Sequence, residues 1–95
     1  MMLTEAQRQQ VRSIVQRVVP GAEVRVFGSR ATGGARPFSD LDLLFVQPAR
    51  LSWQQRADLA DAFEASELPF HVDVVEAAAL SGPVQARVWQ ELAPL

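Results

Sequence analysis

The segment Asp40-Leu41-Asp42-Leu43-Leu44-Phe45-Val46 places two carboxylates at the head of an apolar run. The apolar residues predict a buried strand, although aspartate is among the residues that strands least favour. Side chains two positions apart on a strand point to the same face. Like charges held that close raise the cost of ionising both groups, and a cation between them removes this cost. If one aspartate merely capped a loop and the other faced solvent, the apolar neighbours of Asp42 would be hard to explain.

A Gly-Ser pair and a third aspartate stand in other predicted strands. Gly28-Ser29 closes the strand-like segment 23–27, and Asp73 lies within Phe70-His71-Val72-Asp73-Val74-Val75. Glycine lets the backbone approach a ligand closely. Serine at the start of a helical turn leaves backbone N–H groups for an anion such as a nucleotide phosphate. Because Mg²⁺ is held by one or two carboxylates with phosphates and water, the set predicts a metal-dependent phosphoryl-transfer site.

Several nearby residues are open to two interpretations. Asp73 could complete a metal site and accept a hydroxyl proton, or it could simply face solvent. Arg30 and Arg36 could meet triphosphate oxygens, and His71 could orient a phosphate, but arginine and histidine in such positions are often structural or solvated. Trp53 and Trp89 are expected in the core or at an interface rather than as base-stacking platforms.

Length and composition limit the classes of protein to consider. The 95 residues allow one domain, spanning 1–95, with no separate substrate domain. A net charge of −2 without a basic run makes long nucleic acid an unexpected ligand. The chain has no cysteine and no apolar run of membrane-spanning length, and its start lacks the pattern of a signal peptide. We therefore expect a cytoplasmic protein that depends on a partner or a second copy for any further surface.

The predicted elements follow in the order helix, strand, strand, helix, strand, helix. A capping box at Thr4-Glu5-Ala6-Gln7 opens the first helix, which Pro20-Gly21 ends. Strands are expected over 23–27, 40–46 and 70–75, with a loop over 28–39 that can hold one helical turn after Ser29. The second helix runs from Ser52 to about Glu67 with Leu59, Ala60 and Phe63 inward, and the third begins near Ser81.

The last helix carries Val84, Val88 and Leu92 at helical spacing. The fold class indicated is α/β of the α+β kind: a small mixed sheet with helices packed on one side.

These residues resemble a known family. Gly28-Ser29, ten residues, and then Asp40-Leu41-Asp42 are similar to the Gly-Ser-x10-Asp-x-Asp pattern of polymerase-β-like nucleotidyltransferases. The fuller runs 28–33 and 39–43, with His71-Val72-Asp73-Val74-Val75, resemble the minimal nucleotidyltransferase (MNT) group. The resemblance covers nearly the whole chain in element order.

The resemblance implies a nucleotidyltransferase core in which Asp40, Asp42 and Asp73 are catalytic and bind Mg²⁺, with Asp73 also activating an acceptor hydroxyl. Gly28 and Ser29 would hold the triphosphate, and Arg30, which flanks the loop, is expected to bind the nucleotide beside them. The hydroxyl would attack the α-phosphorus of ATP and release pyrophosphate. Members of the group commonly pair with HEPN-family toxins, and some silence the toxin by transferring AMP to a tyrosine.

Three functions follow as hypotheses. The first is an antitoxin that adenylylates a HEPN partner. The second is an antitoxin that neutralises its toxin by binding alone, through the apolar C-terminal helix with Trp89 and Leu92. The third is a nucleotidyltransferase that modifies a small molecule.

Overall fold

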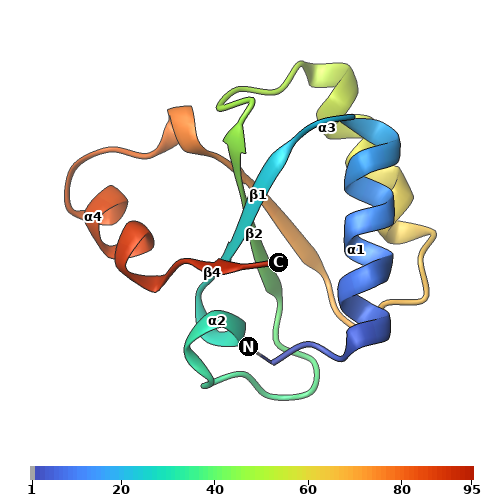
Figure 1. Ribbon diagram of the computed structural model, residues 1–95, viewed down its shortest axis with the longest axis horizontal. Coiled ribbons are helices and arrows are strands. Elements are labelled where there is room, and N and C mark those ends of the chain that lie inside the picture. Colours follow the sequence, from blue (N-terminus) through green and yellow to red (C-terminus); the bar gives the residue numbers. More distant parts are fainter. Residues whose placement is uncertain (1) are drawn as a thin grey trace.

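A mixed sheet forms the centre of the molecule (Figure 1). The computed structural model describes residues 2–95, and within them four strands lie in the order β3-β2-β1-β4. β1 (Glu23–Phe27) pairs antiparallel with both β2 (Leu41–Gln47) and β4 (Ala93–Pro94). β2 pairs in parallel with β3 (Val72–Glu76). The predicted mixed sheet is confirmed, and its three predicted strands begin or end within two residues of the expected positions.

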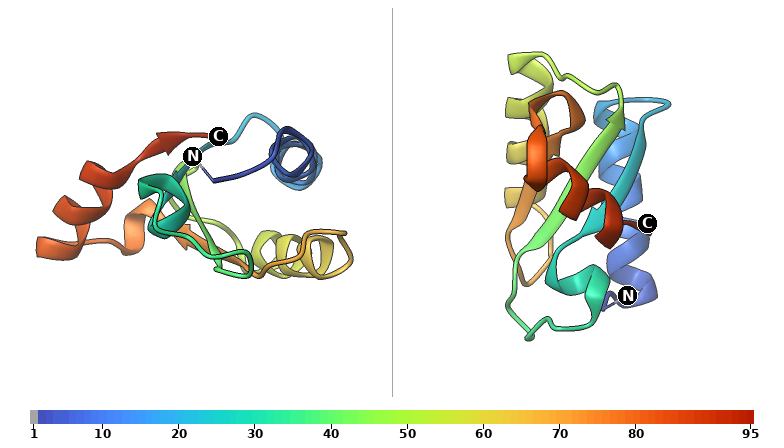
Figure 2. Two further views of the ribbon diagram at one scale, coloured as in Figure 1. Left: turned by 90° about the horizontal axis from the view of Figure 1, so that it is seen from below. Right: turned by 90° about the vertical axis from the view of Figure 1, so that its left-hand side faces the viewer.

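The helices lie on both sides of the sheet rather than on one side (Figure 2). α1 (Glu5–Val18) and α3 (Trp53–Glu64) cover one face, and α4 (Gly82–Glu91) lies on the other. The expectation of helices on a single side was wrong for α4. A single turn, α2 (Ser29–Thr32), follows β1, and the 3₁₀ turn η1 (Ala77–Ala79) follows β3.

Side-chain caps fix the starts of α1 and α3. The Thr4 hydroxyl accepts from the backbone N–H of Gln7 at 3.0 Å, and the Gln7 side chain accepts in return from the Thr4 N–H. Ser52 and Gln55 repeat this arrangement at α3. Both predicted capping boxes are confirmed. Each provides hydrogen-bond acceptors for backbone N–H groups that a helix start leaves unpaired.

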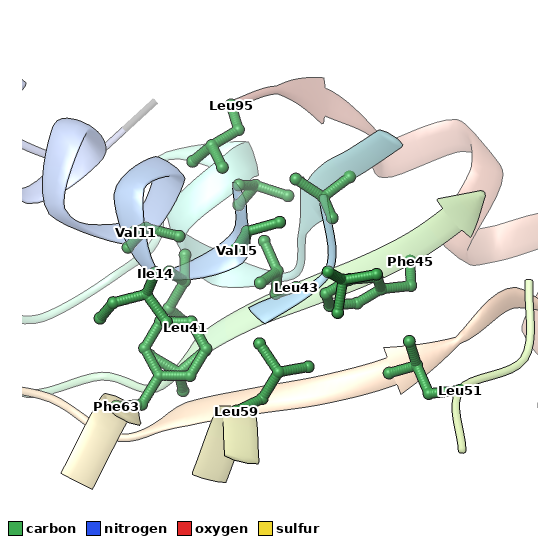
Figure 3. Close-up of a cluster of buried hydrophobic side chains, with 14 of the residues drawn as sticks. Val11, Ile14, Val15, Leu41, Leu43, Phe45, Leu51, Leu59, Phe63 and Leu95 are labelled. Carbon is green, nitrogen blue, oxygen red and sulfur yellow. The ribbon is translucent and has the colours of Figure 1, made fainter. Parts of the chain in front are cut away.

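The main core lies between the sheet and the pair α1 and α3 (Figure 3). One face of each element supplies its buried residues, with helical spacing on α1 and alternation on β2. The contributors include Val11, Ile14, Val15, Leu41, Leu43, Phe45, Leu59 and Phe63. Ala60 is exposed, so its predicted inward position was wrong, whereas Leu59 and Phe63 are buried as expected.

The opposite face of the sheet is covered more lightly. Leu44 is fully buried there, and Val88 of α4 is 2% exposed. Val84 and Trp89 are 50% and 43% exposed, so the predicted apolar stripe of α4 packs through Val88 and not along its whole length. This lighter cover leaves polar residues of β2 and β3 accessible on the α4 side of the sheet.

Two helix ends differ from the expectation. α3 ends at Glu64 rather than Glu67, and the Ser66 hydroxyl donates to the Phe63 carbonyl oxygen at 2.6 Å just beyond it. α4 ends at Glu91, and β4 follows it as an edge strand that was not predicted. The Arg12 Nε donates to the backbone oxygen of Leu95 at 3.0 Å and ties this end of the chain to α1.

No helix within residues 2–95 has the length and apolar character needed to cross a bilayer.

Candidate active site

Strand pairing gathers the predicted site residues at one end of the sheet. Asp42 lies opposite Phe27 in the antiparallel pair and beside Asp73 in the parallel pair. Asp40 precedes Asp42 by two residues, and Gly28 directly follows Phe27. Residues paired across neighbouring strands have their side chains on the same face of the sheet. The pairing therefore brings Gly28, Asp42 and Asp73 to one end of the sheet, and Asp40 lies just before β2 at the same end. Asp42 and Asp73 alternate with core residues, so they lie on the face opposite the main core.

The backbone of Gly28 packs directly against the Asp42 carboxylate. Gly28 has φ 75° and ψ −157°, a conformation almost restricted to glycine. A Cβ built at this position would lie 2.1 Å from Asp42 Oδ2, far inside van der Waals contact. Glycine is thus required here for both its backbone conformation and the space it leaves.

The turn after Gly28 is held by its own hydrogen bonds. The N–H groups of Ala31 and Thr32 both donate to the Gly28 carbonyl oxygen at 3.1 Å. The Thr32 hydroxyl donates to the same oxygen at 3.2 Å. Gly33 then closes the turn with φ 92°. This confirms the helical turn after Ser29, and Ser29 itself is half-buried at its start.

Asp42 is the carboxylate most affected by its surroundings. Partial burial raises the pKa of its side chain, and the negative charges of Asp73, Asp40 and Glu91 raise that pKa further. Each of these effects makes the charged form less favourable. A bound cation would reverse them, because it would attract the carboxylates that now repel one another.

Asp73 has a hydrogen-bonding neighbour of its own. His71 Nε2 lies 3.1 Å from Asp73 Oδ1, with both side chains about half exposed or more. This pair agrees with the prediction that the two residues share a face of the strand. The histidine therefore lies beside the candidate site, in contact with the carboxylate predicted to receive a proton.

Arg30 is buried and hydrogen-bonded to backbone carbonyl oxygens. Its side chain is 5% exposed, and its guanidinium donates to the carbonyl oxygens of Met2, Pro37 and Ser39 at 2.7 to 3.0 Å. The same group lies 4.0 Å above the centre of the Phe70 ring. These contacts use the donors of Arg30 to hold the loop before β2, and the nucleotide-binding role expected of Arg30 stays a prediction. Arg36 is exposed on that loop.

Glu91 is a site residue that the sequence did not reveal. It is the last residue of α4, and its Oε2 accepts a hydrogen bond from the Gly28 N–H at 3.1 Å. The two residues are 63 positions apart, and no local pattern joins them. Only the docking of α4 on the open face of the sheet brings this fourth carboxylate to the others.

The carboxylates suit a hard divalent cation in their chemistry. Carboxylate oxygens are ligands that suit Mg²⁺. Asp40 and Asp42, two residues apart at the start of β2, provide two such carboxylates. Among residues 2–95, no three acidic, histidine or cysteine side chains lie close enough together to bind a metal ion by themselves. A site built on two carboxylates with phosphate oxygens and water fits this arrangement.

A groove of about 740 Å³ opens beside the carboxylates. It runs along the free edge of β3 and the facing side of α3, and Asp40 and Asp73 lie on its wall. Apolar and aromatic side chains form much of the remaining wall, among them Phe38, Phe63, Leu68 and Phe70. Such a groove gives a second molecule access to Asp73.

Comparison with known proteins identifies the family. The model of the nucleotidyltransferase domain matches residues 8–95. The chain belongs to this nucleotidyltransferase family. This confirms the resemblance found in the sequence, and the fold class agrees with it as well.

Two relatives of the nucleotidyltransferase domain are informative. Over 71 residues the chain is 41% identical to the "Probable protein adenylyltransferase MntA" of Haemophilus influenzae, a match that covers 75% of this chain. The chain spans only 62% of that protein's length. A solved structure described as "Structure of putative minimal nucleotidyltransferase" superposes with a TM-score of 0.71 at 40% identity, covering 95% of this chain and 90% of the other.

Proposed function

We propose that this nucleotidyltransferase domain transfers AMP from ATP to a hydroxyl group of a protein, in the presence of Mg²⁺. The observation that carries the proposal is the contact between the Gly28 backbone and the Asp42 carboxylate, with Asp40 and Asp73 beside it. This arrangement puts a close-approach backbone turn next to oxygen ligands for a cation. The family supports a nucleoside triphosphate as donor.

Each residue has a distinct role in the proposed reaction. Asp40 and Asp42 would hold Mg²⁺, which supplies charge compensation for the phosphates when it is bound. Gly28 and Ser29 would hold the triphosphate through the turn that follows β1. Asp73 would accept the proton of the acceptor hydroxyl. The acceptor oxygen then forms a bond to the α-phosphorus, the bond to the β-phosphate oxygen breaks, and pyrophosphate leaves.

The acceptor in this proposal is a HEPN-type toxin, modified on a tyrosine. Support for a protein acceptor comes from the name of the Haemophilus relative. Support for the toxin comes from the resemblance to minimal nucleotidyltransferases. The groove beside Asp73 agrees with an acceptor carried by another molecule, because it leads from the surface to that carboxylate.

A transfer assay tests the proposal. ATP labelled on the α-phosphate, Mg²⁺ and the protein encoded beside this one are mixed with the wild type, with Asp42→Asn and with Asp61→Asn. Asp61 lies exposed on α3, away from the site, and serves as the matched control. We expect label on the neighbouring protein with the wild type and the control, and none with Asp42→Asn. Label that persists at the wild-type rate with Asp42→Asn contradicts the mechanism.

A second candidate function is neutralisation of the toxin by binding alone. The observation that favours it is the exposure of Val84 and Trp89 on α4, which leaves apolar surface for a partner. The double variant Asp40→Asn, Asp42→Asn separates the two functions, because it removes the proposed ligands and leaves α4 unchanged. Full neutralisation by this variant supports binding, and loss of neutralisation supports transfer.

A further inference from the structure

The backbone N–H of Gly28 already has an anionic partner. It donates to the Glu91 carboxylate at 3.1 Å, a hydrogen bond between the end of β1 and the end of α4. Gly28 belongs to the turn that the proposed function assigns to the triphosphate. A single N–H group can donate one good hydrogen bond, and a carboxylate and a phosphate compete for it.

The position of Glu91 is fixed from both directions along the chain. Val88, one helical turn earlier on the same side of α4, is 2% exposed against the sheet. Two residues later, Ala93 pairs with Val26 in the ladder between β4 and β1. Because Glu91 lies between these two anchors and is half-buried, its carboxylate is held at the Gly28 turn rather than reaching it by chance.

The carboxylate of Glu91 lies close enough to the candidate site for its charge to act on Asp42. Beyond the effect of burial, the negative charge of Glu91, with those of Asp73 and Asp40, raises the pKa of Asp42. In the described part of the chain no ion pair neutralises Glu91. The hydrogen bond to Gly28 is the interaction that holds it among like charges. A triphosphate arriving at this turn would meet both an occupied donor and a repelling carboxylate.

We propose that Glu91 is an internal competitor for the triphosphate, seated on the Gly28 N–H in the nucleotide-free protein and displaced when the nucleotide binds. The inference rests on the proposed function, because it takes Gly28 as part of the triphosphate site. Glu91 is in this sense a positioning residue that sets nucleotide affinity. Its displacement requires the side chain to rotate away while Val88 and Ala93 keep α4 and β4 in place.

Equilibrium binding of ATP in the presence of Mg²⁺ tests the proposal by calorimetry. The proteins compared are the wild type, Glu91→Gln, Glu91→Ala and the control Glu67→Gln, which changes an exposed glutamate outside the site. Removing a nearby like charge should tighten ATP binding about tenfold in both Glu91 variants. Adenosine, which lacks phosphates, should bind all four proteins equally. This contrast separates an electrostatic competitor from a residue that only supports the fold.

The amide resonance of Gly28 gives a second measurement. We expect it to shift between the wild type and Glu91→Ala without nucleotide, and to shift again in the wild type when inorganic triphosphate is added. Glu91→Gln keeps the size of the side chain and an acceptor oxygen while removing a like charge, so its unfolding temperature should be no lower than that of the wild type.

The outcomes distinguish this inference from the proposed function. Unchanged or weaker ATP binding by Glu91→Gln and Glu91→Ala, with a wild type that binds ATP and transfers AMP, overturns the role of Glu91 alone. If none of the four proteins binds ATP or inorganic triphosphate, both the proposed function and this inference are wrong. Tighter binding by the Glu91 variants, with the control unchanged, supports the inference.

Discussion

Two features of Gly28 require glycine. Residues with a Cβ rarely adopt its backbone conformation, and its contact with Asp42 leaves no space for a side chain. Its φ of 75° and ψ of −157° fall in a region essentially limited to glycine. The position of a Cβ there would also overlap Asp42 Oδ2. Backbone strain and steric overlap therefore act at the same residue, and they can be separated by substitutions at other glycines of the same loop.

The substitution Gly28→Ala should lower the free energy of unfolding by about 1–3 kcal/mol from the backbone conformation alone. The overlap with Asp42 adds to this loss and moves the carboxylate, so AMP transfer should fall to background. Chemical denaturation and the transfer assay measure the two effects.

Two nearby glycines are the controls for Gly28→Ala. Gly33 has φ 92° with nothing within 4 Å of a built Cβ, so Gly33→Ala should cost about 1 kcal/mol from the left-handed conformation. Gly34 has neither a strained φ nor a close neighbour, and Gly34→Ala should be nearly neutral. Equal losses at all three positions would contradict the steric argument.

The sequence reveals some residues of the candidate site and hides others. Asp40, Asp42 and Asp73 stand out because carboxylates are unexpected within apolar strands, and strand alternation then predicts their common face. Glu91 occupies an ordinary helical position, and its contact with Gly28 depends on how α4 docks. Arg30 stands beside the Gly-Ser pair in the sequence, yet helix geometry directs its guanidinium away from the site toward the loop carbonyls.

At the scale of elements, the loop between α2 and β2 depends on Arg30. Its guanidinium joins the carbonyl oxygens of Pro37 and Ser39 in the loop to that of Met2 near the N-terminus. The planar group of arginine can serve several acceptors at once, whereas the ammonium of lysine is a compact donor. This loop leads directly into Asp40, so its order determines where the first carboxylate lies.

The substitution Arg30→Lys should destabilise the protein by about 2 kcal/mol, because buried carbonyl oxygens lose charged donors. Amide hydrogen exchange should increase over residues 33–40 in particular. Arg36→Lys, an exposed change on the same loop, should stay within about 0.5 kcal/mol of the wild type. If amide hydrogen exchange over residues 33–40 is the same in Arg30→Lys as in Arg36→Lys, Arg30 does not order the loop.

The elements that sequence patterns predicted are those with a buried face or a cap. α1 and α3 begin at capping boxes, and their apolar spacing locates the core. β4 is only two residues long and contains a proline, so neither alternation nor strand propensity marks it. It forms because α4 returns the chain to the free edge of β1.

At the scale of the whole molecule, carboxylates from three parts of the chain lie near enough to Asp42 to act on its charge. Asp40 and Asp42 come with β2, Asp73 with β3 and Glu91 with α4. The main core on the face of the sheet opposite Asp42 supplies the apolar burial that offsets the repulsion among these groups. The fold thus separates a stabilising apolar face from a face on which like charges lie close together.

The pH dependence of stability should report this repulsion. The pKa of Asp42 is raised in the folded state above its usual 3.8, so the folded protein binds the proton more tightly than the unfolded chain does. As pH rises from below 3.8 through the raised pKa, the ionised carboxylate becomes a cost to the folded state. Metal-free Asp42→Asn should therefore unfold at a higher temperature than the wild type near neutral pH, and this difference should vanish at acidic pH.

Addition of Mg²⁺ should narrow or reverse that difference, because the ion compensates the charges in the wild type and loses a ligand in Asp42→Asn. Thermal unfolding with and without Mg²⁺, at neutral and acidic pH, measures all four conditions. Asp61→Asn, an exposed change on α3, should follow the wild type throughout. If the wild type and Asp42→Asn unfold at the same temperature at neutral pH without metal, the clustered charges do not lower the free energy of unfolding. The carboxylates would then need no cation to compensate them.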